Sequence, residues 1–160
     1  MSDCRFKPLI LVALAAGLAS CAPPVAEAPA KKVVTPPAKH KSVGMNARGK
    51  VTSISLTEVF TLQQSGNVLI YDARPGFFYG LSHIPGAISL PKPDCDAQIT
   101  KREAEIKAAI AAKKPIVVYC TNLLCPDART VANHLASFGY SSSVLSGGWD
   151  SWKESGLPTE

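Results

Sequence analysis

Residues 116–126 read Ile-Val-Val-Tyr-Cys-Thr-Asn-Leu-Leu-Cys-Pro, an apolar run that stops at a cysteine and continues into a short loop. The apolar run predicts a buried strand, and the pattern after Pro126 predicts a helix. In open α/β sheets, ligands bind at the carboxyl ends of strands, where the amides of the next helix favour an anion. The sequence therefore predicts that Cys120 lies at such an edge as a thiolate.

Apolar strand segments alternate with helical patterns on both sides of this stretch. Short strands are expected at 68–71, 87–90 and 144–145, with another that begins at Ile54. Helices are expected from Ser55 or Thr57 to Gln64, from a capping box at 100–103 to Lys113, and from Pro126 to Phe138 with Cys125 as N-cap. This order predicts an α/β domain with about five mostly parallel strands and helices on both faces of the sheet.

The first fifty residues differ in composition from the domain predicted at 51–160. Residues 1–20 combine Arg5 and Lys7 with an apolar stretch too short for a convincing membrane span, as in a secretory signal. They end in Leu-Ala-Ser before Cys21, which resembles the lipobox of bacterial lipoproteins. That resemblance implies a lipid on Cys21 and a periplasm-facing protein of the cell envelope, and Ala22 favours the outer membrane over the inner. An ordinary signal peptide that contains a cysteine is the alternative.

Residues 21–50 predict an extended tether, because they are rich in Pro, Ala and Lys and cannot bury a core. Residues 22–50 hold six Lys or Arg against one Glu, whereas residues 51–160 hold nine against ten Asp or Glu. The high isoelectric point of the chain therefore belongs to the tether. This distribution argues against a nucleic-acid-binding domain.

Several motifs of residues 52–160, taken together, resemble a single-domain rhodanese, a module of the sulfurtransferase family. The matching segments are Asp-Ala-Arg at 72–74, Ser-His-Ile-Pro-Gly-Ala at 82–87, Gly-Tyr at 139–140, Gly-Gly-Trp-Asp-Ser-Trp at 147–152 and Gly-Leu-Pro at 156–158. The resemblance implies a rhodanese-like fold and places the catalytic cysteine at Cys120. In the family this thiolate accepts a sulfane sulfur, becomes a persulfide and passes the sulfur to a thiol or to cyanide. No metal and no organic cofactor are implied.

The loop that would cradle the persulfide departs from the family pattern. It comprises Thr121, Asn122, Leu123, Leu124 and Cys125, and the last three of these replace the usual Gly and Arg region. Loss of the loop Arg removes a partner for an anion such as thiosulfate, so the sulfur donor stays open. Arg129 is a candidate anion contact, with a solvated helical side chain as the alternative.

Cys125 is a candidate resolving thiol, which could attack a persulfide or form a reversible disulfide with Cys120. The alternative is a small polar cap without chemistry. Cys95 lies between two acids that disfavour its thiolate, so it is expected to be inert. His83 is expected to orient a turn, and Asp72 and Arg74 to connect strand ends. His40 and His134 give no metal-ligand spacing, and no metal site is predicted.

Three functions follow from these residues. The first is an envelope-anchored sulfurtransferase that acts on a small sulfur-containing substrate or thiol acceptor. The second is a catalytically silent rhodanese-fold module that binds a partner protein of the envelope or a sulfur species. The third is a thiol redox protein that uses Cys120 and Cys125. A phosphatase is excluded, because the position where the loop Arg would stand is occupied by Pro126.

Overall fold

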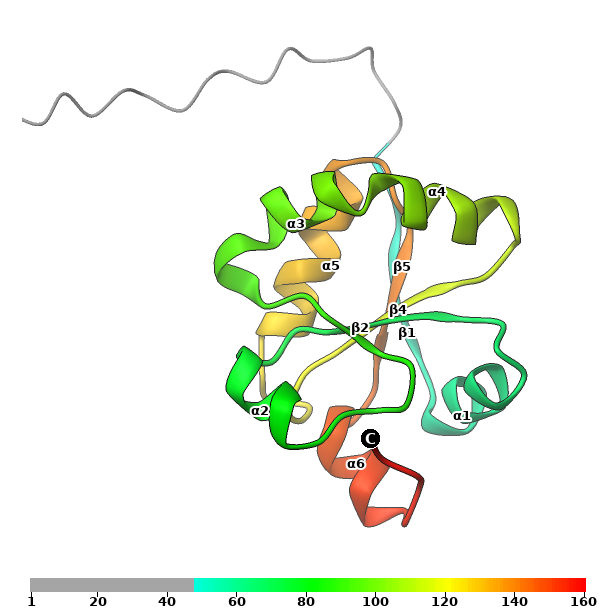
Figure 1. Cartoon of the computed structure of the whole chain (residues 1–160), viewed down its shortest axis with the longest axis vertical. Helices are drawn as coiled ribbons and strands as arrows, with labels where there is room; N and C mark the ends of the chain where they lie inside the picture. The colour runs from blue at the N-terminus through cyan, green and yellow to red at the C-terminus, as the bar shows by residue number, and fades with distance from the viewer. Residues whose placement is uncertain (1–47) are drawn as a thin grey trace, which may run out of the picture. The chain divides into compact units, whose positions relative to one another are not determined.

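The computed structural model describes residues 48–160, and its centre is one parallel β-sheet (Figure 1). Five strands follow one another in the order β1-β5-β4-β2-β3. Their bounds are β1 Val51–Ile54, β2 Leu69–Asp72, β3 Ile88–Ser89, β4 Ile116–Tyr119 and β5 Ser142–Leu145. Every neighbouring pair is parallel, which confirms the predicted α/β class.

Helices cover both faces of the sheet, because the central strands bury alternate side chains on opposite sides. Tyr71 and Val118 pack with helices α3 (Cys95–Lys101), α4 (Glu103–Ala111) and α5 (Asp127–Ser137). Ile70 and Val117 pack in a second cluster with α1 (Leu56–Gln64) and α6 (Gly148–Glu154). Such central strands, buried on both sides, are expected in parallel sheets.

The helix predictions hold for α1 and fail at the junction of α3 and α4. Of the two predicted caps, Ser55 and Thr57, the structure has Ser55 at the N-cap of α1, where it forms a capping box with Glu58. Thr100, predicted to open a capping box, lies inside α3 instead. Its hydroxyl donates to the carbonyl of Asp96, 3.0 Å away, and is therefore engaged in the preceding turn. In place of the single helix predicted from 100 to Lys113, the structure has two helices, α3 and α4, which meet at Arg102.

Strand β1 ends at Ile54, where the sequence reading expected it to begin. It is an edge strand paired with β5, and Thr52 and Ser53 are exposed. An exposed edge strand needs no apolar run, so hydrophobic patterning gives no signal for it. Helix α2 (Gly76–Leu81) follows β2 along the chain. Strand β3 and a short 3-10 helix at Lys92–Asp94 come next.

No helix within residues 48–160 is both long and apolar enough to traverse a bilayer. The predicted signal at 1–20, the lipid site Cys21 and most of the tether at 21–50 lie outside the described residues. Those expectations therefore stay predictions.

Candidate active site

The loop that follows β4 is fixed at its start by the amino end of α6. The carbonyl oxygens of Cys120 and Thr121 accept hydrogen bonds from the backbone amides of Trp149 and Asp150, each 2.8 Å away. Gly148 permits this approach, because a Cβ atom there would collide with the Cys120 carbonyl. Cys120 is consequently held at the carboxyl edge of the sheet, where the sequence places it.

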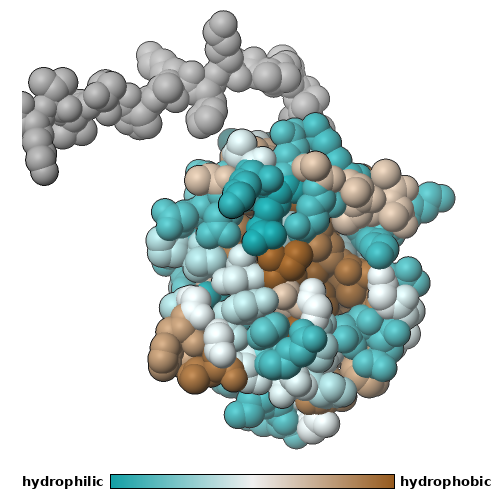
Figure 2. All heavy atoms as spheres, viewed as in Figure 1, coloured by the Kyte–Doolittle hydropathy of each residue, from teal (hydrophilic) through white to brown (hydrophobic). Residues whose placement is uncertain are grey.

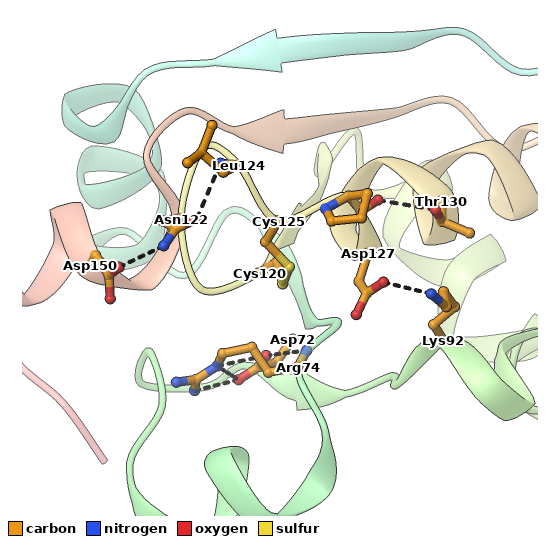
Figure 3. Close-up of a disulfide and its surroundings, with 11 residues drawn as sticks. Asp72, Arg74, Lys92, Cys120, Asn122, Leu124, Cys125, Asp127, Thr130 and Asp150 are labelled. Atoms are coloured by element: carbon orange, nitrogen blue, oxygen red, sulfur yellow. Dashed lines mark hydrogen bonds and ion pairs between the residues drawn. A yellow bond between two sulfur atoms is a disulfide. The ribbon is translucent and has the colours of Figure 1, made fainter.

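Cys120 and Cys125 form a disulfide across the loop, and their Cα atoms are 6.2 Å apart (Figure 3). The expectation that Cys120 is a thiolate is therefore wrong for this form of the protein. The loop folds back so that the two Sγ atoms meet, and a bonded sulfur is not a thiolate. The resolving-thiol alternative for Cys125, rather than the inert cap, agrees with this pairing.

Asn122 organises the turn between the two cysteines, a role that the sequence reading did not assign. Its backbone carbonyl accepts the amide of Cys125 at 3.2 Å, and its side-chain Oδ1 accepts the amide of Leu124 at 3.1 Å. The side-chain Nδ2 donates to Asp150 in α6, also at 3.1 Å. Asn122 therefore ties the turn to the same helix that fixes Cys120 (Figure 3).

Helix α5 begins at Asp127 with Pro126 as its N-cap, so the prediction that Cys125 is the N-cap is wrong by one residue. Cys125 turns toward Cys120 instead of toward the helix amides. The Asp127 carboxylate, in the first turn, pairs with Lys92 at 2.9 Å (Figure 3). Proline has no amide hydrogen, so the capping position supplies no donor to a ligand.

A small cavity opens beside the disulfide at the carboxyl ends of three strands. Its polar lining includes Ser53, Asn122, Arg129 and Ser146, next to Cys120 and Cys125. Arg129 is exposed and lies at this cavity, as required of the predicted anion contact. Ser53 and Ser146 were missed by the sequence reading. Ser146 follows β5 directly, so the rule that ligands bind at carboxyl strand ends would have found it.

Leu123 and Leu124 project from the loop with 79% and 90% of their surfaces exposed. Two leucines at the rim make the approach to the disulfide apolar. Thr121 is also exposed, and its backbone carbonyl is held by the amide of Asp150. The loop therefore has little packing against the core between its two cysteines.

The sequence profile of the rhodanese-like domain matches residues 55–155, which is most of the described part of the chain. The chain belongs to the rhodanese-like family. This assignment confirms the resemblance drawn from the motifs at 72–74, 82–87 and 147–158.

Relatives of this rhodanese-like domain differ in their names and lengths. The chain is 32% identical over 111 residues to the HTH-type transcriptional regulator Rv0324 of Mycobacterium tuberculosis, a match that covers 68% of the chain and 44% of the regulator. The chain thus spans less than half the length of that curated relative. Among solved structures, BH2092 of Bacillus halodurans gives a TM-score of 0.59 at 25% identity, with 68% of this chain and 76% of that chain covered. The human single-domain sulfurtransferase TSTD1 gives a TM-score of 0.51 at 24% identity, with 64% of this chain and 95% of that chain covered. This likeness shows a shared fold.

The Asp-Ala-Arg motif of the rhodanese-like domain forms a buried ion pair that does not touch the cavity. Arg74 Nη2 lies 2.6 Å from Asp72 Oδ2 and also donates to the carbonyl of Ser82 at 2.8 Å. The Tyr119 hydroxyl donates to the same carboxylate at 2.6 Å, and the guanidinium stacks 4.5 Å from the ring centre of Trp149. The prediction that Asp72 and Arg74 connect strand ends is confirmed.

Burial and this pairing shift the pKa values of Arg74 and Tyr119. Burial lowers the pKa of Arg74, but the hydrogen bonds and charge of Asp72 outweigh it and raise the pKa overall. Burial, reinforced by the Asp72 carboxylate, raises the pKa of the Tyr119 phenol far above its usual range. The cluster therefore keeps a positive guanidinium and a neutral phenol over the physiological range.

His83 has a structural role in the domain, as predicted. Its Nδ1 lies 2.9 Å from the carbonyl of Tyr79, and the two rings stack with centroids 3.9 Å apart. Its backbone exchanges two hydrogen bonds with Glu160, which fastens the carboxyl terminus. Nothing in these contacts directs the ring toward Cys120.

Cys95 is a buried free thiol at the start of α3. Burial raises its pKa, and the neighbouring Asp96 raises it further, in agreement with the expected inert thiol. The structure also brings His134 to Asp96, with Nδ1 and Oδ1 2.6 Å apart. Cys95, Asp96 and His134 each offer one atom that could bind a metal ion, and these three atoms lie within 4.8 Å of one another. No local sequence pattern indicates this grouping, because Asp96 and His134 lie in two helices and are 38 residues apart.

The two phenylalanines of α2 are exposed. Phe77 and Phe78 expose 71% and 49% of their surfaces and contact each other edge to face. Figure 2 shows apolar surface over α2, at the lower left of that view. Trp149 and Trp152 are both buried.

Proposed function

We propose that this rhodanese-like domain is a sulfurtransferase in which Cys120 carries a sulfane sulfur as a persulfide. The observation that supports it most strongly is the position of Cys120, at the carboxyl end of β4 and in the lining of the small cavity. Members of the rhodanese-like family often have this activity, and the required nucleophile is a cysteine thiolate.

The cysteine of residues 48–160 that lies outside the disulfide does not suit this chemistry. Cys95 is buried, its pKa is raised, and it is absent from the cavity lining. A thiol in that environment stays protonated and out of reach of a substrate. Cys120 is therefore the residue proposed to attack the donor.

The loop favours an organic persulfide or polysulfide as donor over thiosulfate. Leu123 and Leu124 make the rim apolar, while Arg129 is the cation among the residues that line the cavity. A single exposed arginine gives weaker anion binding than a cradle of several donors. The disulfide must be reduced before loading, because Cys120 is not a nucleophilic thiolate while its Sγ is bonded to Cys125.

Cyanide provides a direct test of sulfur transfer. The full chain carrying Cys4→Ser, Cys21→Ser and Cys125→Ser is incubated with glutathione persulfide and then with cyanide, and thiocyanate is measured. The same chain with Cys120→Ser is the matched control. Thiocyanate above the control supports the proposal, whereas equal amounts from both chains would refute it.

A thiol oxidoreductase is the second candidate, and the disulfide between Cys120 and Cys125 is the observation that favours it. Such a protein exchanges electrons with a partner dithiol and takes up no sulfane sulfur. The two candidates differ in the Cys125→Ser chain. A sulfurtransferase gains one sulfur atom at Cys120 in that chain, and a pure oxidoreductase gains none.

We also propose that the domain is attached to the bacterial cell envelope through a lipid on Cys21, facing the periplasm. The support is the sequence Leu-Ala-Ser-Cys at 18–21 and the lysine-rich tether after it. Fractionation of cells that express the chain tests this. The wild-type chain is expected in the outer-membrane fraction and the Cys21→Ser chain outside it, and an unchanged distribution would contradict the anchor.

A further inference from the structure

We infer that Cys125 attacks the Cys120 persulfide and expels its outer sulfur as hydrosulfide, which makes this domain a reductase of sulfane sulfur. The inference rests on the proposed function, since it requires a persulfide on Cys120. It adds an activity that transfer to an external acceptor does not include. The Cys120–Cys125 disulfide is, in this account, the product of the step.

The position of the disulfide indicates which sulfur is attacked. A persulfide on Cys120 has an inner sulfur, Sγ, and an outer sulfur bonded to it. The structure joins the Sγ atoms of Cys120 and Cys125, so the loop allows direct contact between Cys125 and the inner sulfur (Figure 3). The Cα separation of 6.2 Å is within the usual disulfide range, so neither backbone segment has to move far from this arrangement.

The bonds and electrons of the step balance. The Cys125 thiolate forms a bond to Sγ of Cys120, and the bond between Sγ and the outer sulfur breaks. The electron pair of that bond leaves with the outer sulfur, which already holds a proton and departs as HS⁻. The sulfane sulfur is reduced by two electrons, and the two cysteines are oxidised to the disulfide.

A further turnover needs a dithiol reductant, which we identify by class as a protein dithiol. Its first thiolate attacks the disulfide, and its second releases the mixed disulfide, so that Cys120 and Cys125 return as thiols. The sum of the cycle is one persulfide and one dithiol converted to one thiol, one hydrosulfide and one disulfide of the reductant.

The contacts of the loop suit repeated opening and closing. Cys120 is fixed through its carbonyl to Trp149, and Cys125 packs against the core of the sheet. Between them, Leu123 and Leu124 are exposed and contribute little to the core. Segments with few buried contacts rearrange at low cost, so reduction of the disulfide leaves the fold of the sheet intact.

Proximity favours this internal step over transfer to a dilute acceptor. Only five positions in sequence separate the two cysteines, and both occur in the lining of one cavity. Intramolecular thiols in contact react as if present at very high concentration. An external thiol must instead reach the same persulfide by diffusion from solvent.

The experiment follows both sulfide and protein mass. The full chain carrying Cys4→Ser and Cys21→Ser is reduced, freed of reductant and mixed with one equivalent of glutathione persulfide, without other acceptor. We expect about one equivalent of sulfide and a loop disulfide in the digest. With Cys125→Ser added, we expect a chain one sulfur atom heavier at Cys120 and sulfide release lower by at least about tenfold.

Failure of the inference differs from failure of the proposed function. If the Cys125→Ser chain loads sulfur but the parent chain keeps the same adduct and releases no sulfide, the inference is overturned and the sulfurtransferase remains. Equal sulfide release from both chains also overturns it. If the Cys125→Ser chain takes up no sulfur, both proposals fail. A Cys95→Ala chain is the control that should release sulfide like the parent, and a loss there would assign the resolving thiol to Cys95.

Discussion

Two loops leave the carboxyl edge of the same sheet, and they differ in what their polar groups do. The loop after β2 contains Arg74, which is 2% exposed and paired with Asp72. The loop after β4 contains Cys120 and Cys125, and its leucines are almost fully exposed. One loop satisfies its charged groups inside the protein, and the other leaves reactive sulfur beside a cavity.

The difference shows that a motif with charged residues need not bind a substrate. The Asp72 carboxylate already accepts hydrogen bonds from Arg74 and Tyr119, so it has little capacity left for a ligand. Removing one partner of such a pair leaves an uncompensated buried charge. The loop after β4 has no comparable network, and its turn depends on Asn122.

The largest expected effect is on chemistry in the loop after β4. Cys120→Ser in the chain with Cys125→Ser should abolish sulfur loading, because a hydroxyl is not ionised at neutral pH and does not attack sulfur. Mass spectrometry after incubation with glutathione persulfide measures it. Unfolding by urea should show little change in stability, and loading that persists in this chain would contradict the assigned nucleophile.

The next effect concerns stability in the loop after β2. Asp72→Ala should destabilise the domain by about 3–5 kcal/mol, because Arg74 would remain buried without its partner. The urea midpoint, compared at unchanged slope, measures the loss. If Asp72→Ala proves no more destabilising than a change in the exposed leucines, the scaffold role of this cluster is wrong.

Tyr119→Phe should cost about 1.5–3 kcal/mol, because its hydroxyl donates to a buried carboxylate. The same variant tests an effect of pH. The folded protein holds the phenolic proton of Tyr119 beyond the pH at which the unfolded chain releases it. The contribution of this proton to the free energy of unfolding is therefore fully present below pH about 10 and declines above it. Urea titrations at several alkaline pH values should show a shallower decline in Tyr119→Phe, and an identical decline would refute the raised pKa.

The smallest effect on stability is expected from the rim of the loop after β4. Leu124→Ser should change stability by less than about 0.5 kcal/mol, because 90% of the side chain is exposed. Thermal unfolding of the parent and variant chains provides the comparison. A drop of several kcal/mol would mean that the loop packs against the domain more firmly than its exposure indicates.

The sequence predicts the parts of the fold that depend on local patterns. The buried strand at 116–119, the cap at Ser55 and the position of Cys120 at a sheet edge follow from hydrophobic runs and short-range hydrogen bonds. The edge strand β1 depends on pairing with β5, which is distant in sequence, and no hydrophobic run marks it. The division of α3 from α4 was missed because Thr100 lies inside α3 rather than at a helix start.

The candidate site was predictable in its nucleophile and less so in its surroundings. Cys125 was recognised as a possible partner of Cys120, but its distance from that residue depends on how the loop folds. The contribution of Asn122 depends on a hydrogen bond to Asp150, which is 28 residues away. The approach of His134 to Asp96 likewise arises only when α5 packs on α3.

The location of the sulfur adduct tests the central claim most directly. The full chain carrying Cys4→Ser, Cys21→Ser and Cys125→Ser retains two thiols, Cys95 and Cys120. After brief incubation with glutathione persulfide, digestion and mass spectrometry show which of them gained sulfur. The account predicts one added sulfur atom on the peptide with Cys120 and none on the peptide with Cys95. Sulfur on Cys95 alone, or on neither peptide, would contradict it.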